Sequence, residues 1–192
     1  MEAPGSKGHR EQTAVVPTGR RSWPYVVAVP VSAGVLVWAL NFVLVQRPVS
    51  AALDADSRNA GYALSAHYSF YVNPSTLVLD LRTISEAAPI DLFRGLFQTA
   101  AALSESGRRF ERVVLARRGD AVFQIKGDDF DQLGREFKGG QNPVFLLRTL
   151  PAKLHRPSGE AAFGQWEGGL LGVVGKQMED LTAAGRSWAG SQ

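Results

Sequence analysis

Cysteine is absent from this 192-residue sequence. Without thiols the chain has no disulfide, no thiolate nucleophile and no cysteine-ligated zinc, a composition that fits either side of a membrane. The three histidines, His9, His67 and His155, include no pair at helical i,i+4 spacing and no HExxH pattern. We therefore expect no metal site and no cofactor.

A basic surface of the kind that binds nucleic acid is also missing. The formal net charge is only +3, and acidic residues closely follow the densest arginine cluster. No base-stacking module accompanies that cluster, so the sequence predicts no nucleic-acid partner. The arginines are Arg108, Arg109, Arg112, Arg117 and Arg118.

A phosphate-binding loop is suggested by the stretch GGLLGVVGKQ, residues 168–177, but its spacing excludes one. The pattern G-x-x-x-x-G-K-[ST] needs a glycine at the position of Leu170 and a hydroxyl at the position of Gln177. The sequence therefore predicts no nucleotide ligand.

Two interpretations of these glycines remain. Gly168, Gly172 and Gly175 recur at i, i+4 and i+7, which favours a helix face that packs closely on a neighbour. Alternatively, the segment lies in the outer membrane leaflet together with Phe163 and Trp166. Under the favoured interpretation, Gly172→Leu destabilises the domain.

Charge is missing from one long hydrophobic run, Tyr25–Val45. As a helix, its 21 residues span roughly 30 Å, the thickness of a bilayer's hydrocarbon core. Trp23 and Tyr25 are suited to the headgroup interface at one end. The run predicts a transmembrane helix, and hence a lipid bilayer as a partner.

Flanking charge predicts the orientation of this span. Four basic residues precede it and two follow, which places the N-terminus in the cytoplasm and the remainder outside. The preceding residues are Lys7, Arg10, Arg20 and Arg21, and the following ones are Arg47 and Arg58. The reversed topology, with the domain in the cytoplasm, is the alternative.

Processing is a further open point. Val49-Ser50-Ala51 resembles a signal peptidase site, so the chain is either cleaved after Ala51 or retained as a signal anchor. The apolar run is longer than a typical secretory signal, which favours the uncleaved anchor.

Composition divides the chain into four parts. We expect a disordered basic cytoplasmic tail at 1–22, a transmembrane helix at 23–46, a connector at 47–74 and an extracytoplasmic α/β domain at 75–192. Within the connector, Ser57–Tyr68 suggests a short helix.

The pattern within 75–192 predicts one α/β layer of about four strands, partly antiparallel, in the order β-α-β-β-α-β-α. The expected elements are a strand at 76–81, a helix from Pro89 to a stop at Gly107, a hairpin of 112–117 and 121–126, a helix capped by Asp128, a strand at 144–148 and a final helix within 163–188.

Carboxylates are the candidate catalytic groups. Asp80 lies near the end of the first strand, and Arg82 follows on the same face, so this pair is either a catalytic site or an ion pair that closes the strand edge. The run Asp128-Asp129-Phe130-Asp131 lacks the spacing of a calcium loop, and acidic residues also suit a helix's first turn. Ser65 and His67 lack the GxSxG elbow of a hydrolase.

Two functions follow from these observations. The first is a single-pass membrane protein whose extracytoplasmic domain is a non-catalytic subunit or scaffold of an envelope assembly, with a protein partner in the membrane or envelope. The second is a membrane-anchored enzyme with a carboxylate-based site around Asp80, Arg82 and Asp128.

Overall fold

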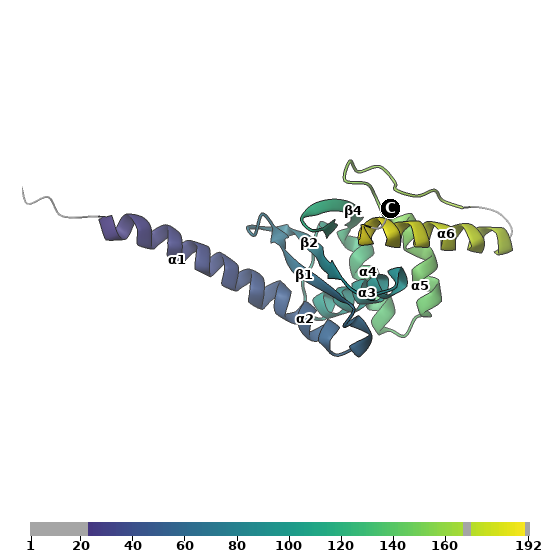
Figure 1. The fold of residues 1–192 in the computed structure, drawn as a ribbon, viewed down its shortest axis with the longest axis horizontal. Helices are drawn as coiled ribbons and strands as arrows, with labels where there is room; N and C mark the ends of the chain where they lie inside the picture. Colours follow the sequence, from purple (N-terminus) through teal and green to yellow (C-terminus); the bar gives the residue numbers. More distant parts are fainter. Residues whose placement is uncertain (1–22, 167–169, 191–192) are drawn as a thin grey trace, which may run out of the picture. The chain divides into compact units, whose positions relative to one another are not determined.

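A four-stranded mixed sheet organises the folded part of the chain (Figure 1). The structure is a computed structural model that describes residues 23–166 and 170–190, so the predicted tail at 1–22 lies outside it. The strands are β1 (Tyr62–Ser69), β2 (Asn73–Ile84), β3 (Arg112–Arg117) and β4 (Asp120–Lys126), in that spatial order. β1–β2 and β3–β4 are antiparallel, and β2–β3 is parallel. The predicted α/β class with a partly antiparallel sheet is confirmed.

The apolar N-terminal run is helical, and the helical conformation continues beyond it. Helix α1 (Trp23–Asn41) is followed by a π-helical segment, η1 (Phe42–Gln46), and by α2 (Arg47–Asp54). A 3-10 turn, η2 (Ser57–Asn59), leads into β1. Residues from Val35 onward belong to one compact unit.

The connector predicted at 47–74 is therefore part of the folded domain. It forms α2, η2 and β1 and begins β2. The short helix expected over Ser57–Tyr68 is wrong, because Leu64, Ala66 and Tyr68 alternate with half-buried residues and so follow the two-residue period of a strand.

One face of the sheet carries the core. Leu77, Leu79 and Leu81 of β2 are fully buried, as are Phe93 and Leu96 of α3. Helix α3 (Pro89–Glu105) connects the parallel strands β2 and β3 and packs against α4 (Gly127–Lys138) (Figure 1). The predicted helix from Pro89 and the predicted hairpin at 112–126 are confirmed.

The strand predicted at 144–148 is wrong. This run forms helix α5 (Pro143–Thr149), and β1 supplies the fourth strand instead. Asn142 caps the helix, because its Oδ1 accepts a hydrogen bond from the Val144 amide at 2.9 Å, and Pro143 occupies the first turn. A short 3-10 turn, η3 (Pro151–Lys153), follows.

The last helix, α6 (Leu170–Ala189), does not pack closely through the predicted glycines. No atom lies within 4 Å of a Cβ built at Gly172 or Gly175, and Gly168 lies outside the described residues. The close approach is at Gly185, where a Cβ would overlap the Pro89 ring. Trp188 secures this end of α6, since its Nε1 donates to the Ala116 carbonyl at 3.0 Å.

Candidate functional site

Asp80 and Arg82 meet on the face of β2 opposite the leucine core. Asp80 pairs with Ser65 of β1 and Ala116 of β3 across the sheet, so it lies on a central strand and is only 1% exposed. The Arg82 Nη2 lies 3.1 Å from the Asp80 Oδ2. Among the described residues no donor forms a hydrogen bond with either Asp80 carboxylate oxygen, so the guanidinium is its charge partner. Desolvating a carboxylate is costly, and the ion pair offsets that cost.

Arg82 also connects this pair to a small groove. Its Nε donates to the Ser65 hydroxyl at 3.1 Å. The groove has a volume of about 170 Å³. Asp80 does not line the groove, whereas its partner Arg82 does. The lining residues are Trp38, Asn41, Phe42, Gln46, Ser65, Ala66, His67, Tyr71 and Arg82.

The hydrogen bonds of the Ser65 hydroxyl go to residues other than His67: it donates to the Asp80 carbonyl at 3.5 Å and accepts from Arg82 Nε at 3.1 Å. The His67 ring stacks on Tyr71 with 4.6 Å between centroids, and its Nδ1 lies 2.9 Å from the Tyr68 carbonyl oxygen. Because one ring nitrogen faces a carbonyl, that nitrogen carries the proton and the imidazole is held by main chain and aromatic contacts. The groove therefore has aromatic walls and an arginine, and within the described residues its hydroxyl is paired with Arg82 and the Asp80 carbonyl.

Asp128 lies elsewhere. Asp128 comes two residues after Lys126, the end of β4. Across the sheet, Lys126 pairs with Arg112, and Arg112 pairs with Thr76 of β2. Thr76 is four residues before Asp80. At about 3.3 Å per strand residue this separation is roughly 13 Å. Asp128 is exposed and, contrary to prediction, is not the cap of α4, which is Lys126.

The neighbouring carboxylates point to different partners. The Asp129 carboxylate accepts from Lys153 Nζ at 2.7 Å. Asp131 pairs with Arg109 at 2.9 Å and with Arg135, and it accepts from the Ser104 hydroxyl at 2.7 Å. Burial alone would raise the pKa of Asp131, but the Ser104 hydrogen bond and the two guanidiniums outweigh burial and lower it. Within the described ranges no three His, Cys, Asp or Glu side chains are grouped as metal ligands would be.

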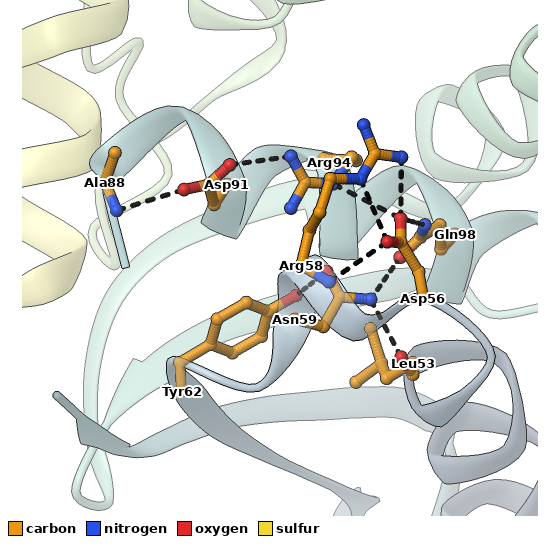
Figure 2. Close-up of polar contacts among 9 residues, drawn as sticks. All are labelled: Leu53, Asp56, Arg58, Asn59, Tyr62, Ala88, Asp91, Arg94 and Gln98. Atoms are coloured by element: carbon orange, nitrogen blue, oxygen red, sulfur yellow. Dashed lines mark hydrogen bonds and ion pairs between the residues drawn. The ribbon is translucent and has the colours of Figure 1, made fainter. Parts of the chain in front are cut away.

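A second polar cluster, which sequence reasoning missed, joins η2 to α3 (Figure 2). Arg58 donates to both oxygens of Asp56, at 2.9 and 2.8 Å, and Gln98 Nε2 donates to the same carboxylate at 2.9 Å. Asn59 Nδ2 donates to Gln98 Oε1 at 2.7 Å and to the Leu53 carbonyl at 2.9 Å. We name these side chains, together with Tyr62, Asp91 and Arg94, the η2–α3 cluster.

The η2–α3 cluster shifts the pKa values of three groups, since the hydrogen bond with Asp56 also raises the pKa of the Arg58 guanidinium. The hydrogen bonds from Arg58 hold the pKa of the Asp56 carboxyl well below its usual range. Burial raises the pKa of the Tyr62 hydroxyl to about 12, and that hydroxyl donates to Asn59 Oδ1 at 2.9 Å. Arg94 links Asp91, at 2.6 Å, to Asp56, at 3.6 Å.

These contacts connect η2 to α3, so the role of the cluster is structural. Apart from the buried Arg94 Nε and Nη2, which form no hydrogen bond with a described residue, the polar groups described above are directed at one another and connect the segment after α2 to α3. Asp56 and Arg58 are two residues apart, which hinted at local pairing, but nothing in the sequence indicated that Gln98 would complete the network. A cavity of about 400 Å³ borders it, lined in part by Leu53, Asn59 and Tyr62.

No family model, curated protein or solved structure matches this chain. The described residues define its class: a mixed α/β domain preceded by one helix that is long and apolar enough to cross a membrane.

Proposed function

We propose that this chain is a single-pass membrane protein whose uncleaved N-terminal helix is the anchor. Its domain lies outside the cytoplasm and serves as a non-catalytic subunit or scaffold of an envelope assembly. The observation that carries the proposal is the helical course from Trp23 to Asp54, along which an uncharged run continues into the hydrophobic core.

Burial within this helix supports retention of the anchor. Val45 and Val49 are completely buried in the domain core. Gln46 Oε1 accepts a hydrogen bond from the Ala66 amide at 2.6 Å, so it satisfies a backbone group on the outer side of β1. Cleavage after Ala51 would remove all three side chains and leave the edge of the core open to water.

The same burial shortens the proposed lipid-embedded segment. The sequence suggested a span of 23–46, but Asn41 and Val45 pack against the domain. Helix α1, Trp23–Asn41, has 19 residues and a length of roughly 29 Å, which matches the hydrocarbon core.

A non-catalytic role is favoured by the arrangement around Asp80. Its carboxylate is covered and neutralised by Arg82, so a substrate in the neighbouring groove would meet the guanidinium and aromatic rings first. The enzyme alternative keeps Asp80, Arg82 and Asp128 as its candidates. Asp128, however, lies at the far end of the sheet from the other two.

The test is purification of the full chain, anchor included, from native membranes in a gentle detergent, with chemical cross-linking before extraction. We expect a stoichiometric partner whose cross-links map to 47–190 rather than to α1 alone. Recovery of the chain by itself, with no cross-linked species, would count against the scaffold function.

An Asp80→Asn chain separates the two functions. The scaffold proposal expects that a folded Asp80→Asn protein still recovers the partner and restores the phenotype of cells that lack the gene. The enzyme alternative expects partner recovery without restoration. Arg82→Lys, which retains the charge, is the matched control for disturbance of the ion pair.

A further inference from the structure

The turn between β1 and β2 exposes three consecutive apolar residues. Phe70 is 87% exposed, Tyr71 46% and Val72 67%. Phe70 and Tyr71 have positive φ values of 50° and 62°, a left-handed conformation that non-glycine residues rarely adopt. The turn is nevertheless held, because the Tyr71 amide donates to the Tyr68 carbonyl at 2.8 Å. A strained backbone with outward apolar side chains suggests that the turn has a partner.

Hydrogen bonds place this turn beside the end of α1. Gln46 contacts the Ala66 amide, and five residues earlier in the helix Asn41 accepts from the Tyr68 amide at 2.8 Å. The Asn41 Nδ2 also donates to the Tyr71 carbonyl at 2.7 Å. β1 therefore runs antiparallel to this part of the helix, and its turn reaches the level of Asn41.

The helix surface at this level is also aromatic and exposed. Trp38 and Phe42 stack with 5.6 Å between their ring centroids, and they are 61% and 45% exposed. Together with the turn they gather four aromatic side chains where α1 ends. Aromatic residues are enriched at the two interfaces of a membrane-spanning segment.

Charge is absent from both segments that form this region. No Asp, Glu, Lys or Arg occurs in 22–46 or in 59–79. The ionised side chains of the η2–α3 cluster lie at the opposite end of β1, where Tyr62 pairs with Ile84. The turn end of the β1–β2 hairpin itself is therefore uncharged, and the basic side chains near it come from other positions: Arg82 in the groove, and Arg112 and Lys126 level with Thr76.

We propose that Phe70, Tyr71 and Val72 insert into the lipid interface beside α1, as a second membrane contact of the domain. This inference rests on the proposed membrane anchor. The occupant is the lipid surface rather than a protein, because the turn is hydrogen-bonded to the end of the helix proposed to span the bilayer. The contact would hold the domain against the membrane and restrict its rotation about the anchor.

The lack of native cysteines permits a direct test with single labels. The full chain carrying Phe70→Cys is labelled with an environment-sensitive fluorophore and reconstituted into phosphatidylcholine vesicles that contain a nitroxide near the headgroup end of the acyl chain. Leu36→Cys, on the exposed surface of α1, reports on the anchor, and Ser158→Cys, in an exposed loop, is the aqueous control.

We expect lipid quenching at positions 70 and 36 and none at 158. Quenching at 36 with position 70 behaving like 158 overturns this inference and leaves the anchor intact. Loss of quenching at 36 overturns the anchor itself, and the inference with it. If position 70 is shielded from both the nitroxide and aqueous iodide, a protein covers the turn, and the lipid contact is again wrong.

Discussion

Gly95 of α3 lies directly beneath Tyr62. A Cβ at this position would overlap the Tyr62 hydroxyl, which donates to Asn59 Oδ1 in the η2–α3 cluster. The absence of a side chain at one helical position therefore permits a contact between α3 and the segment that follows α2.

Gly95→Ala is expected to destabilise the domain by about 1–3 kcal/mol, because the ring must move and its hydrogen bond is strained. Gly172→Ala is the matched control, since nothing lies within 4 Å of its Cβ. This control should raise stability by up to about 1 kcal/mol through helix propensity alone. Thermal unfolding of the full chain in mild detergent measures the stability of both variants. Equal effects of the two substitutions would contradict the close contact between Gly95 and Tyr62. Since the space around Gly172 is open, Gly172→Leu is not expected to destabilise the domain, contrary to the sequence-based prediction.

The ionised Asp56 carboxylate makes the stability of the domain depend on pH in the acid range. Its folded-state pKa is depressed, so its contribution is complete above the unfolded-state value of about 4 and is lost as pH falls toward the folded value. We expect Asp56→Asn to be less stable than the native chain at pH 7 and to lose less stability on acidification below about pH 4. Unfolding midpoints between neutral and acid pH give the comparison. Asp54 is an exposed neighbour, so the stability of Asp54→Asn should change with pH as that of the native chain does. A native-like pH profile for Asp56→Asn would show that the Asp56 carboxylate does not contribute to stability.

At the scale of elements, the segment Phe42–Gln46 has two distinct sides. Val45 is 0% exposed and Val43 is 54% exposed, although they are only two residues apart. Because both have the same side chain, they separate the effect of core packing from that of helix propensity.

Val45→Ala is expected to cost about 1–3 kcal/mol of domain stability, through lost burial and the resulting cavity. Val43→Ala should change it by less than about 0.5 kcal/mol, as expected for an exposed site. Chemical denaturation in detergent, followed by a probe within the sheet, provides the measurement. A similar loss for both variants would show that this segment does not belong to the core.

Elements with strong local signals were predictable. The β3–β4 hairpin has two β-rich runs around Arg118-Gly119, and both turn residues have positive φ, which suits a tight two-residue turn. The conformation of Val144–Arg148 was not predictable in this way, because a short apolar run is compatible with either a strand or a buried helix. The Asn142-Pro143 pair before it was the available helix-start signal.

At the scale of the whole molecule, the proposed anchor makes a claim about the mature chain. We expect the protein extracted from membranes to retain the N-terminal helix, because Val45 and Val49, which precede Ala51, form part of the core. Mass spectrometry of the purified chain decides this. A mass that corresponds to a chain beginning at Ala52 would show that the helix acts as a cleaved signal.

Orientation is tested separately. A reporter fused after Gln192 should be active only outside the cytoplasm, as the excess of basic residues before the span predicts. Activity confined to the cytoplasm would establish the reversed topology.

The candidate site was only partly predictable from residues close together in the sequence. The Asp80–Arg82 ion pair was foreseeable, because residues two apart on a strand share a face. Its burial and its distance from Asp128 were not, because they depend on strand order and on which end of the sheet each residue occupies. The η2–α3 cluster joins residues about 40 positions apart, so no local pattern indicated it.

By itself, the sequence determined a helix long and apolar enough to cross a membrane, a mixed α/β domain and the β3–β4 hairpin, because composition, periodicity and turn chemistry act over short stretches of chain. Only the tertiary structure decided that this helix continues into the core, that β1 is the fourth strand and that the Phe70–Val72 turn lies beside Asn41. These features depend on long-range contacts such as Asn41 with Tyr68, whose partners are chosen by the packing of the whole domain.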